Sequence, residues 1–461
     1  MKLVVVGGGI AGLAAAYRLE RLVPEAEIVL LERTERLGGK LLTEHENGFV
    51  VEGAADSFLS RKHRGVGLAE ELGLAGELVG RRPENARTFV RHGDLLHPLP
   101  EGLTGMIPTN LDALEGSGLL SQSGRKRLAA EADVPVEPAG ADESIASFVS
   151  RRFGREAYER LVEPLMSGIY GGDGDQLSLQ ATFPNLRTLE LEHGSVLGGL
   201  AAQPSPAADY PPFVSFRQGM ETFAQRLTQS LERTRILKRW ITDYVESRDG
   251  RYAVGTRFGG PFEADGVVLA VPAFSVAKLL SVLDPELSRL HSEIPLASSA
   301  IVTLAYRRED VSHRLDGYGY VVPRIVGSDV LACTWSSSKW EDRAPARRVL
   351  LRVYAGRFGG RDVTRMTKKD LVTLARDEVR LLGIESQPLL VWVHRWPRGM
   401  PQYVLGHPER LERIDAALAR HPGLALAGAA YRGVGIPDCI ASGEAAAESV
   451  LSGLPQVKTA K

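Results

Sequence analysis

The sequence predicts an α/β fold, in which a parallel sheet covered by helices is assembled from both ends of the chain. Three observations predict it. A strand, a glycine-rich turn and a helix follow one another over residues 3–22, a second strand–turn–helix unit begins at residue 424, and helix-forming residues dominate the middle of the chain. Strands that alternate with helices are typical of α/β proteins, whereas a helix-rich middle indicates an insertion.

The first unit has the spacing of a Rossmann-like, dinucleotide-binding turn. A short β-branched run, Leu3–Val6, precedes three glycines in GxGxxG spacing, namely Gly7, Gly9 and Gly12. The first glycine permits a tight turn, the second lets backbone amides approach a pyrophosphate, and the third lets the helix pack close to the strand. The N-terminus of the following helix, residues 11–22, faces the negative charge of the phosphates.

A second strand, Glu27–Leu31, ends at an acidic residue. Glu32 lies where a carboxylate can accept hydrogen bonds from the ribose hydroxyls of an adenine dinucleotide, and its charge favours a ribose without a 2′-phosphate. The next segment, Arg36–Lys40, adds a second glycine pair and two cations, as suits a long cofactor whose pyrophosphate is held by two loops. The set GxGxxG, Glu32 and RxGG resembles the FAD-binding signature of the amine oxidase and phytoene desaturase superfamily.

Further elements are expected along the chain. Residues 81–100 read as a β-hairpin around a turn at 91–94, residues 119–198 as mainly helical, and residues 197–212 as a loop or partly disordered connector. Strands are expected at 48–52, 236–241, 252–258, 265–272, 299–306, 349–354 and 389–394, and helices at 219–231 and 368–382.

The last unit has the same strand–turn–helix pattern as the first. Leu424–Ala427 reads as a buried strand, Gly428 as a tight turn, and a helix begins at about Pro437, where proline is tolerated because no N–H is needed. The N-terminus of this helix is a natural seat for the flavin C2 carbonyl or a developing negative charge at N1. We therefore assign 1–80, 213–275 and 405–461 to an FAD-binding domain, 81–100 and 276–404 to a mixed-sheet substrate-binding domain, and 101–212 to an α-helical insertion, a candidate for membrane contact and substrate entry.

Composition excludes several classes of function. A formal net charge of -1 over 461 residues gives no overall attraction to nucleic acid. Cys333 and Cys439 form no CxxC pair, metal-binding spacing or disulfide framework, which fits a reducing compartment. No apolar run is long enough to span a bilayer, and the first strand begins too early for a signal peptide. We expect a cytoplasmic protein without a transmembrane segment, with peripheral membrane contact left open.

Four separated segments resemble the protoporphyrinogen oxidase family: Leu161–Asp173, Leu177–Leu186, Arg395–His407 and Ala430–Ile440. Two more segments, Asp56–Lys62 and Ala332–Trp340, look more like its Gram-positive branch, which oxidises coproporphyrinogen III. The similarity covers nearly the whole chain. It departs from the family pattern at Glu52–Ala55 and Gly428–Ala430, both near the flavin, where backbone atoms would make the contacts.

The resemblance implies an FAD-dependent oxidoreductase acting on CH-CH groups with oxygen as acceptor. It would carry out the six-electron oxidation of coproporphyrinogen III to coproporphyrin III in haem biosynthesis, by three rounds of hydride transfer to flavin N5, with hydrogen peroxide as by-product. Protoporphyrinogen IX oxidation is the alternative, and an amine oxidase or carotenoid desaturase is a more remote one. A non-redox binding protein, like a Rab GDP-dissociation inhibitor, would not need the intact dinucleotide motif. The implied partners are the tetrapyrrole, molecular oxygen and, as a product acceptor, ferrochelatase.

The motifs and the resemblance together predict the site. FAD is expected to contact Gly7, Gly8, Gly9, Ile10, Ala11, Gly12, Glu32, Arg33, Arg36, Gly38, Gly39, Lys40, Glu52, Gly53, Ala54, Ala55, Ile241, Trp396, Gly428, Val434, Gly435 and Ile436. The substrate is expected to contact Arg61, Lys62, Gly168, Ile169 and Tyr403. No catalytic side chain and no metal are expected, because flavin N5 carries the chemistry.

Structural alternatives remain for several of these residues. The basic run Arg61–Arg64 suits substrate propionates but also a solvated face. Trp396 and Tyr403 could instead be a packed aromatic pair. His394 and His407 could serve as general bases, but structural histidines explain them more simply.

Overall fold

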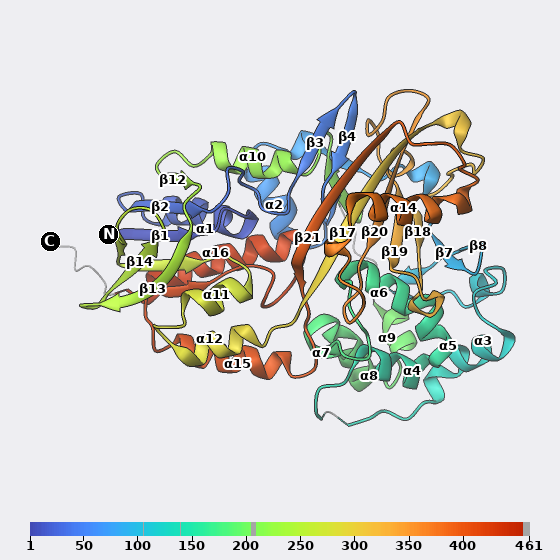
Figure 1. The fold of residues 1–461 in the computed structure, drawn as a ribbon. Helices are drawn as coiled ribbons and strands as arrows, with labels where there is room; N and C mark the ends of the chain where they lie inside the picture. Colours follow the sequence, from blue (N-terminus) through green and yellow to red (C-terminus); the bar gives the residue numbers. More distant parts are fainter. Residues whose placement is uncertain (105, 139, 204–208, 455–461) are drawn as a thin grey trace.

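The computed structural model describes residues 1–104, 106–138, 140–203 and 209–454, and it has three regions. Figure 1 shows a parallel sheet with its helices next to the N-terminus, a larger sheet at the opposite end of the molecule, and a group of helices packed below the larger sheet. The long strands β17 and β21 run from the larger sheet toward the parallel one. The predicted α/β class is confirmed, whereas the exact domain boundaries stay a prediction.

The parallel sheet has five strands from distant parts of the chain, in the order β12-β2-β1-β16-β22. All four pairings are parallel. The strands are β1 (Lys2–Val6), β2 (Glu27–Glu32), β12 (Arg235–Lys238), β16 (Gly266–Leu269) and β22 (Leu424–Leu426). The two strand–turn–helix units predicted from the sequence therefore lie in one sheet, separated only by β16.

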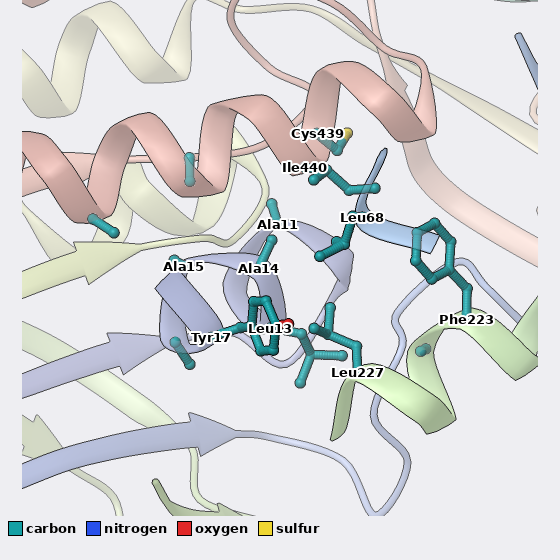
Figure 2. Close-up of a cluster of buried hydrophobic side chains, with 14 of the residues drawn as sticks. Ala11, Leu13, Ala14, Ala15, Tyr17, Leu68, Phe223, Leu227, Cys439 and Ile440 are labelled. Carbon is teal, nitrogen blue, oxygen red and sulfur yellow. The ribbon is translucent and has the colours of Figure 1, made fainter. Parts of the chain in front are cut away.

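One face of this sheet is covered by α1 (Ile10–Leu22) and α16 (Ile436–Ser452), which pack tightly because their contacting residues are small. A Cβ at Gly443 of α16 would overlap the carbonyl oxygen of Ala11, so any side chain there would push the helices apart. Figure 2 shows the alanines of α1 facing α16, and Leu13 and Tyr17 facing α10 (Glu221–Gln229).

The other face of the parallel sheet packs against a second apolar cluster. A three-stranded antiparallel sheet contributes to it, together with three helices. These elements are β13 (Thr242–Arg248), β14 (Arg251–Thr256), β15 (Phe262–Ala264), α11 (Ala273–Leu279), α12 (Pro285–Ser292) and α15 (His407–Leu418). Both faces being buried explains why the central strands are almost uniformly apolar.

The larger sheet is mixed, with seven strands in the order β21-β17-β20-β19-β18-β7-β8, and only β18 and β7 pair in parallel. Its strands are β7 (Phe89–His92), β8 (Leu95–Pro98), β17 (Leu296–Arg307), β18 (Gly319–Val321), β19 (Val330–Trp335), β20 (Arg348–Ala355) and β21 (Leu390–Pro401). The predicted hairpin at 81–100 appears as β7 and β8. The helix α14 (Lys368–Val379) packs on one face of this sheet.

Helices form the predicted insertion. They are α3 (Gln122–Ala129), α4 (Ile145–Phe153), α5 (Arg155–Ala157), α6 (Glu163–Tyr170), α7 (Leu179–Thr182), α8 (Pro184–His193) and α9 (Val196–Ala202), with one turn of π-helix at Tyr158–Val162 between α5 and α6. The prediction of a connector at 197–212 is wrong for its first part. Ser195 accepts a hydrogen bond from the backbone N–H of Gly198 and caps α9, and this local capping signal outweighed the small-residue composition. Residues 204–208 of that connector lie outside the described residues.

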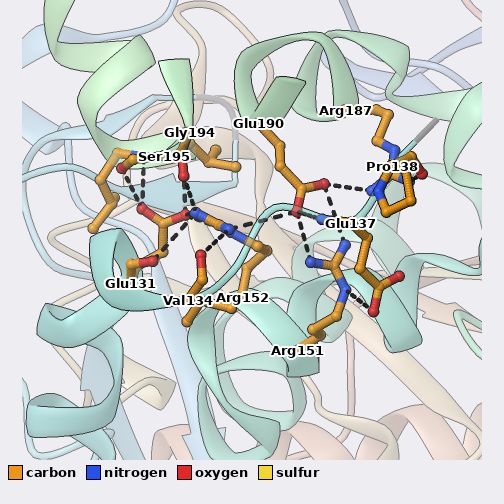
Figure 3. A network of polar contacts seen from close by, with 12 residues as sticks. Glu131, Val134, Glu137, Pro138, Arg151, Arg152, Arg187, Glu190, Gly194 and Ser195 are labelled. Carbon is orange, nitrogen blue, oxygen red and sulfur yellow. Dashed lines mark hydrogen bonds and ion pairs between the residues drawn. The ribbon is translucent and has the colours of Figure 1, made fainter. Parts of the chain in front are cut away.

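A buried ionic network connects these helices (Figure 3). Arg152 of α4 and Glu131 are both completely buried and form an ion pair, and Ser195 Oγ donates a hydrogen bond of 2.5 Å to the same carboxylate. Glu190 of α8 pairs with Arg151 at 2.6 Å. Because a buried charge is tolerated only when it is paired, the network fixes how α4, α8 and the start of α9 meet.

Smaller elements complete the fold. There are two smaller sheets. One is the hairpin of β3 (Thr43–Glu46) and β4 (Phe49–Glu52), and the other has three strands, β5 (Phe58–Leu59), β11 (Phe213–Phe216) and β6 (Leu78–Gly80), with β11 in the middle. The remaining ones are α2 (His63–Glu71), β9 (Leu103–Thr104), β10 (Ile107–Pro108) and α13 (Ser336–Lys339). Among the described residues, no helix combines the length and the hydropathy needed to cross a membrane.

Candidate cofactor and substrate site

The glycines of the first turn have two different functions. Gly7 has a φ of +108°, which disfavours any side chain, and a Cβ at Gly12 would overlap the carbonyl oxygen of Gly7. At Gly9, by contrast, a Cβ would meet nothing closer than Gly39 Cα at 4.0 Å. Packing therefore requires Gly7 and Gly12, whereas Gly9 borders open space at the N-terminus of α1, where a pyrophosphate can approach the backbone.

Glu32 lies at the carboxyl end of β2 and organises the same turn. Its carboxylate accepts hydrogen bonds from the backbone N–H of Gly8 at 2.8 Å and from the N–H and hydroxyl of Thr34 at 2.8 and 2.7 Å. A carboxylate has about four acceptor positions, so one remains for a ribose hydroxyl. Arg33 beside it is exposed. Ile241 follows β12 and is half-buried, and the preceding Trp240 N–H donates to the Glu32 carbonyl at 2.9 Å.

The second glycine-rich loop lies against the first. The Gly38 N–H donates to the Gly8 carbonyl at 2.8 Å. The Arg36 guanidinium donates to the carbonyls of Leu37 at 3.0 Å and Leu41 at 2.7 Å, so this arginine fixes the loop. Lys40 is exposed and donates from Nζ to the Gly399 carbonyl, and the protein atoms around its ammonium lower its pKa.

The loop before α16 approaches the first turn from the other side. Gly428 has a φ of +112°, its N–H donates to Ser442 Oγ at 3.0 Å, and a Cβ there would lie 3.9 Å from the Cβ of Ala11. The predicted residues Val434, Gly435 and Ile436 are half-buried and lead directly into α16. The N-termini of α1 and α16 thus open near each other.

Tyr403 supports this loop. Its hydroxyl donates to the Ala429 carbonyl at 2.7 Å and accepts from the Gly433 N–H at 2.9 Å, and its ring stacks on His407 with centroids 4.3 Å apart. The ring is fully buried, so it offers no surface to the substrate that it was expected to contact. His407 is also buried and lies 3.0 Å from the Tyr431 carbonyl, and burial lowers its pKa to about 4. It is therefore a neutral packing residue rather than a base at neutral pH.

The segment Glu52–Ala55 crosses the face of the seven-stranded sheet that is not covered by α14. Trp396 Nε1 donates to the Gly53 carbonyl at 2.8 Å, and the Arg352 guanidinium donates to the Ala54 carbonyl. Glu52 is buried and accepts from Thr43 Oγ1 at 2.8 Å and from the Met220 N–H at 2.9 Å. Gly53 and Ala54 are therefore held through their backbone carbonyls, whereas Glu52 is held through its side-chain carboxylate.

His394 lies close to this segment. Its Nε2 is 2.6 Å from Glu44 Oε1, and a Cβ at Gly53 would lie 3.0 Å from its ring. Partnered in this way, His394 positions the edge of β21 beside the segment.

The predicted substrate residues differ in whether they are free to contact a ligand. On α6, Gly168 is exposed and Ile169 has 47 % of its surface accessible, which is unusual for an isoleucine and suits contact with an apolar ring. Arg61 is exposed, but Lys62 pairs with Asp438 of α16 at 2.6 Å. Lys62 thus ties α2 to the first turn of α16.

Sequence reasoning missed a group of charged residues beside Ala55. Asp56 hydrogen-bonds to Lys339 at 2.9 Å, and Arg352 lies 3.4 Å from it. Lys339 falls within the segment Ala332–Trp340 that carried the family resemblance, but only the fold brings it to Asp56.

The residues present fit an adenine dinucleotide that carries a flavin. A Cβ at Gly9 or Gly428 would have a single neighbour, at 4.0 and 3.9 Å, so both positions leave room for a ligand beside the N-termini of α1 and α16, and Glu32 keeps an acceptor position for a ribose hydroxyl. This donor set can bind a pyrophosphate and orient a flat ring near the segment Glu52–Ala55.

Comparison with known proteins shows similarity over almost the whole chain. Residues 10–451 match the family described as flavin containing amine oxidoreductase. The coproporphyrinogen III oxidase of Bacillus subtilis is 34% identical, with 97% of each chain covered. The chloroplastic protoporphyrinogen oxidase of Oryza sativa subsp. japonica is 31% identical, covering 95% of this chain and 85% of its own length.

Solved structures show the same similarity in fold. A crystal structure from Exiguobacterium sp. 255-15, provisionally named a protoporphyrinogen oxidase, superposes with a TM-score of 0.87 at 35% identity, covering 97% of this chain and 98% of its own. Cyclohexylamine oxidase from Brevibacterium oxydans shares the fold with a TM-score of 0.68 at 16% identity, with 98% of each chain covered.

Proposed function

Because the chain belongs to the flavin-containing amine oxidoreductase family, we propose that it is an FAD-dependent oxidase that converts coproporphyrinogen III to coproporphyrin III in haem biosynthesis. The overall reaction removes six electrons and six protons from the macrocycle and delivers them to oxygen as hydrogen peroxide. The observation that carries the proposal is full-length similarity to relatives of that name, 34% identical in Bacillus subtilis and 31% in Staphylococcus aureus.

The chain's own residues would hold the cofactor and exclude water. Backbone amides at Gly9 and Ile10 would bind the pyrophosphate, Glu32 the ribose, and the N-terminus of α16 the flavin ring. When bound, FAD supplies the redox chemistry, by accepting electrons from the substrate and passing them to oxygen. The segment Glu52–Ala55, held by Trp396 and Arg352, would form the wall on the substrate side.

Substrate recognition requires an apolar wall and cations, because a porphyrinogen is a disc with carboxylates at its rim. Ile169 offers an exposed apolar side chain on α6. Protoporphyrinogen IX is the second candidate substrate, and it is supported by the 31% identity to the rice protoporphyrinogen oxidase. Cytoplasmic location, membrane contact and docking to ferrochelatase stay predictions.

Parallel rate measurements test the proposal. The FAD-loaded protein is mixed with coproporphyrinogen III or protoporphyrinogen IX in aerated buffer, and porphyrin fluorescence and peroxide are followed together. We expect faster turnover of coproporphyrinogen III and peroxide formation in step with porphyrin. Preferred oxidation of protoporphyrinogen IX would establish the alternative, and oxidation of neither would refute both.

A further inference from the structure

An acidic side chain lies between two cations directly after the segment Glu52–Ala55. Lys339 Nζ donates to the two oxygens of Asp56 at 3.1 and 2.9 Å, and Arg352 Nη1 lies 3.4 Å from the same carboxylate. Trp340 Nε1 adds a hydrogen bond of 3.3 Å. Burial alone would raise the pKa of Asp56, but Lys339 and Arg352 hold it well below its usual range, so the carboxylate is ionised.

Arg81 brings a third cation to this cluster. Its guanidinium carbon lies 4.5 Å from the centre of the Phe213 ring and 4.6 Å from that of Tyr318. Stacking on rings leaves the N–H groups, which lie in the guanidinium plane, available for a ligand. Within the part of the chain that the structure describes, no carboxylate forms an ion pair with Arg81, and burial lowers its pKa.

The cluster carries an excess of positive charge. Arg81, Lys339, Arg343 and Arg352 contribute four positive charges, and Asp56 and Glu52 at most two negative ones, which leaves at least two positive charges uncompensated. Lys339 and Asp56 expose only 15% and 11% of their side chains, and burial lowers the pKa of Lys339 as well. Partly buried cations without counter-charges are unfavourable, so the arrangement favours an anionic ligand.

Backbone topology places Arg81 close to Arg61, which is predicted to contact the substrate. Strands β5 and β6 both pair antiparallel with β11 and therefore run in the same direction. Arg61 follows the C-terminal end of β5 and Arg81 follows the C-terminal end of β6, so both arginines lie at the same end of this three-stranded sheet. The Arg82 N–H donates to the Lys339 carbonyl at 3.0 Å, which joins this edge to the residues around Asp56.

We propose that Arg81, with Lys339 and Arg352 behind it, binds a carboxylate of the substrate and so favours a tetrapyrrole with four carboxylates over one with two. The planar guanidinium matches a carboxylate through two parallel hydrogen bonds, and the neighbouring cations add attraction at short range. The inference rests on the proposed function, because it takes the substrate to be a porphyrinogen.

Equilibrium binding of the product tests this role without turnover. FAD-loaded wild-type protein, Arg81→Gln, Arg81→Lys and Arg82→Gln are titrated with coproporphyrin III, and the porphyrin fluorescence gives Kd. Arg82 is the matched control, since its side chain is 38% exposed and pairs with Glu84 at 2.7 Å. We expect Arg81→Gln to weaken binding about tenfold, Arg81→Lys to recover part of the loss, and Arg82→Gln to stay within about twofold of wild type.

The tetramethyl ester of coproporphyrin III distinguishes charge recognition from a structural effect. It has the same ring but no carboxylates, so wild type and Arg81→Gln should bind it equally. The inference is overturned if Arg81→Gln binds coproporphyrin III as tightly as wild type, or if it loses the same factor with acid and ester. Either result leaves the proposed function intact as long as the wild type oxidises coproporphyrinogen III. A wild type that oxidises neither porphyrinogen would overturn the function and this inference together.

Discussion

Two glycines of the first turn, Gly9 and Gly12, have different surroundings in the structure. Gly12 is required because its Cα lies against the Gly7 carbonyl, whereas Gly9 faces open space. The motif predicts these different roles, and the structure shows the packing role of Gly12 directly, while cofactor contact at Gly9 stays a prediction.

This difference gives a first prediction. Gly12→Ala should destabilise the protein by at least about 2 kcal/mol, because the new methyl group meets backbone that cannot move. Gly9→Ala should leave the unfolding of the FAD-free protein unchanged but weaken FAD binding about tenfold, because the methyl group separates the amides from the pyrophosphate. Denaturant unfolding and quenching of flavin fluorescence measure the two effects, and equal loss of stability in both variants would contradict the assignment.

His407 gives a second prediction at this scale. Its pKa is about 4 in the folded protein, because it is buried against Tyr403 with Arg410 and Arg432 nearby, and it should return to about 6.5 on unfolding. Between pH 6.5 and pH 4 the imidazole of His407 is therefore protonated in the unfolded state but neutral in the folded state. Stability is unaffected above pH 6.5 and falls by about 3 kcal/mol as the pH drops to 4.

The comparison of wild type with His407→Gln isolates this contribution. The difference in unfolding free energy between the two proteins should shrink from pH 7 to pH 4, because glutamine does not titrate. His45, which is exposed, provides the control variant His45→Gln. A difference that stays constant over this range would show that His407 is protonated as easily in the folded state as in the unfolded one.

Residue-level prediction from the sequence succeeded where the signal was local. The placement of Gly7, Gly9, Gly12 and Glu32 follows from spacing within a single strand–turn–helix unit. The pairing of Asp56 with Lys339 could not be predicted, since these residues are separated by 283 positions and only the sheet topology brings them together.

The helices of the insertion are held together by a buried ionic network. Helices α4 and α8 of the insertion meet through ionic side chains, and the buried pair Arg152–Glu131 ties α4 to the residues before α9. The capping by Ser195 and the bond from its hydroxyl to Glu131 make one side chain serve both the helix and the network. This dual use explains why a stretch rich in small residues still begins with a helix.

Removal of one partner should therefore be costly for the insertion. Arg152→Met leaves Glu131 charged and unpaired in the interior, and we expect a loss of about 3–5 kcal/mol in unfolding free energy. The matched variant Arg155→Met removes an exposed partner of Glu159 on a neighbouring helix and should change stability by at most about 0.5 kcal/mol. Urea denaturation of both variants checks this, and similar stabilities would show that the network contributes little.

At the scale of the whole molecule, the parallel sheet is assembled from strands that lie far apart in the sequence. The fold class was predictable because both strand–turn–helix units carry their own signals. The strand order was not, because nothing local indicates that β12 pairs with β2 or that β16 lies between β1 and β22. The strand β3 was also missed, since Thr43–Glu46 is mostly polar and exposed, without the apolar alternation expected of a strand.

We propose that FAD, held between the N-termini of α1 and α16, oxidises a porphyrinogen. Anaerobic mixing of the FAD-loaded protein with coproporphyrinogen III tests it most directly, with flavin and porphyrin absorbance recorded in the same experiment. We expect the flavin band to bleach as the coproporphyrin band appears, and the flavin band to return when oxygen is admitted. A flavin band that persists beside unreacted coproporphyrinogen III, or a protein that binds no FAD, would contradict it.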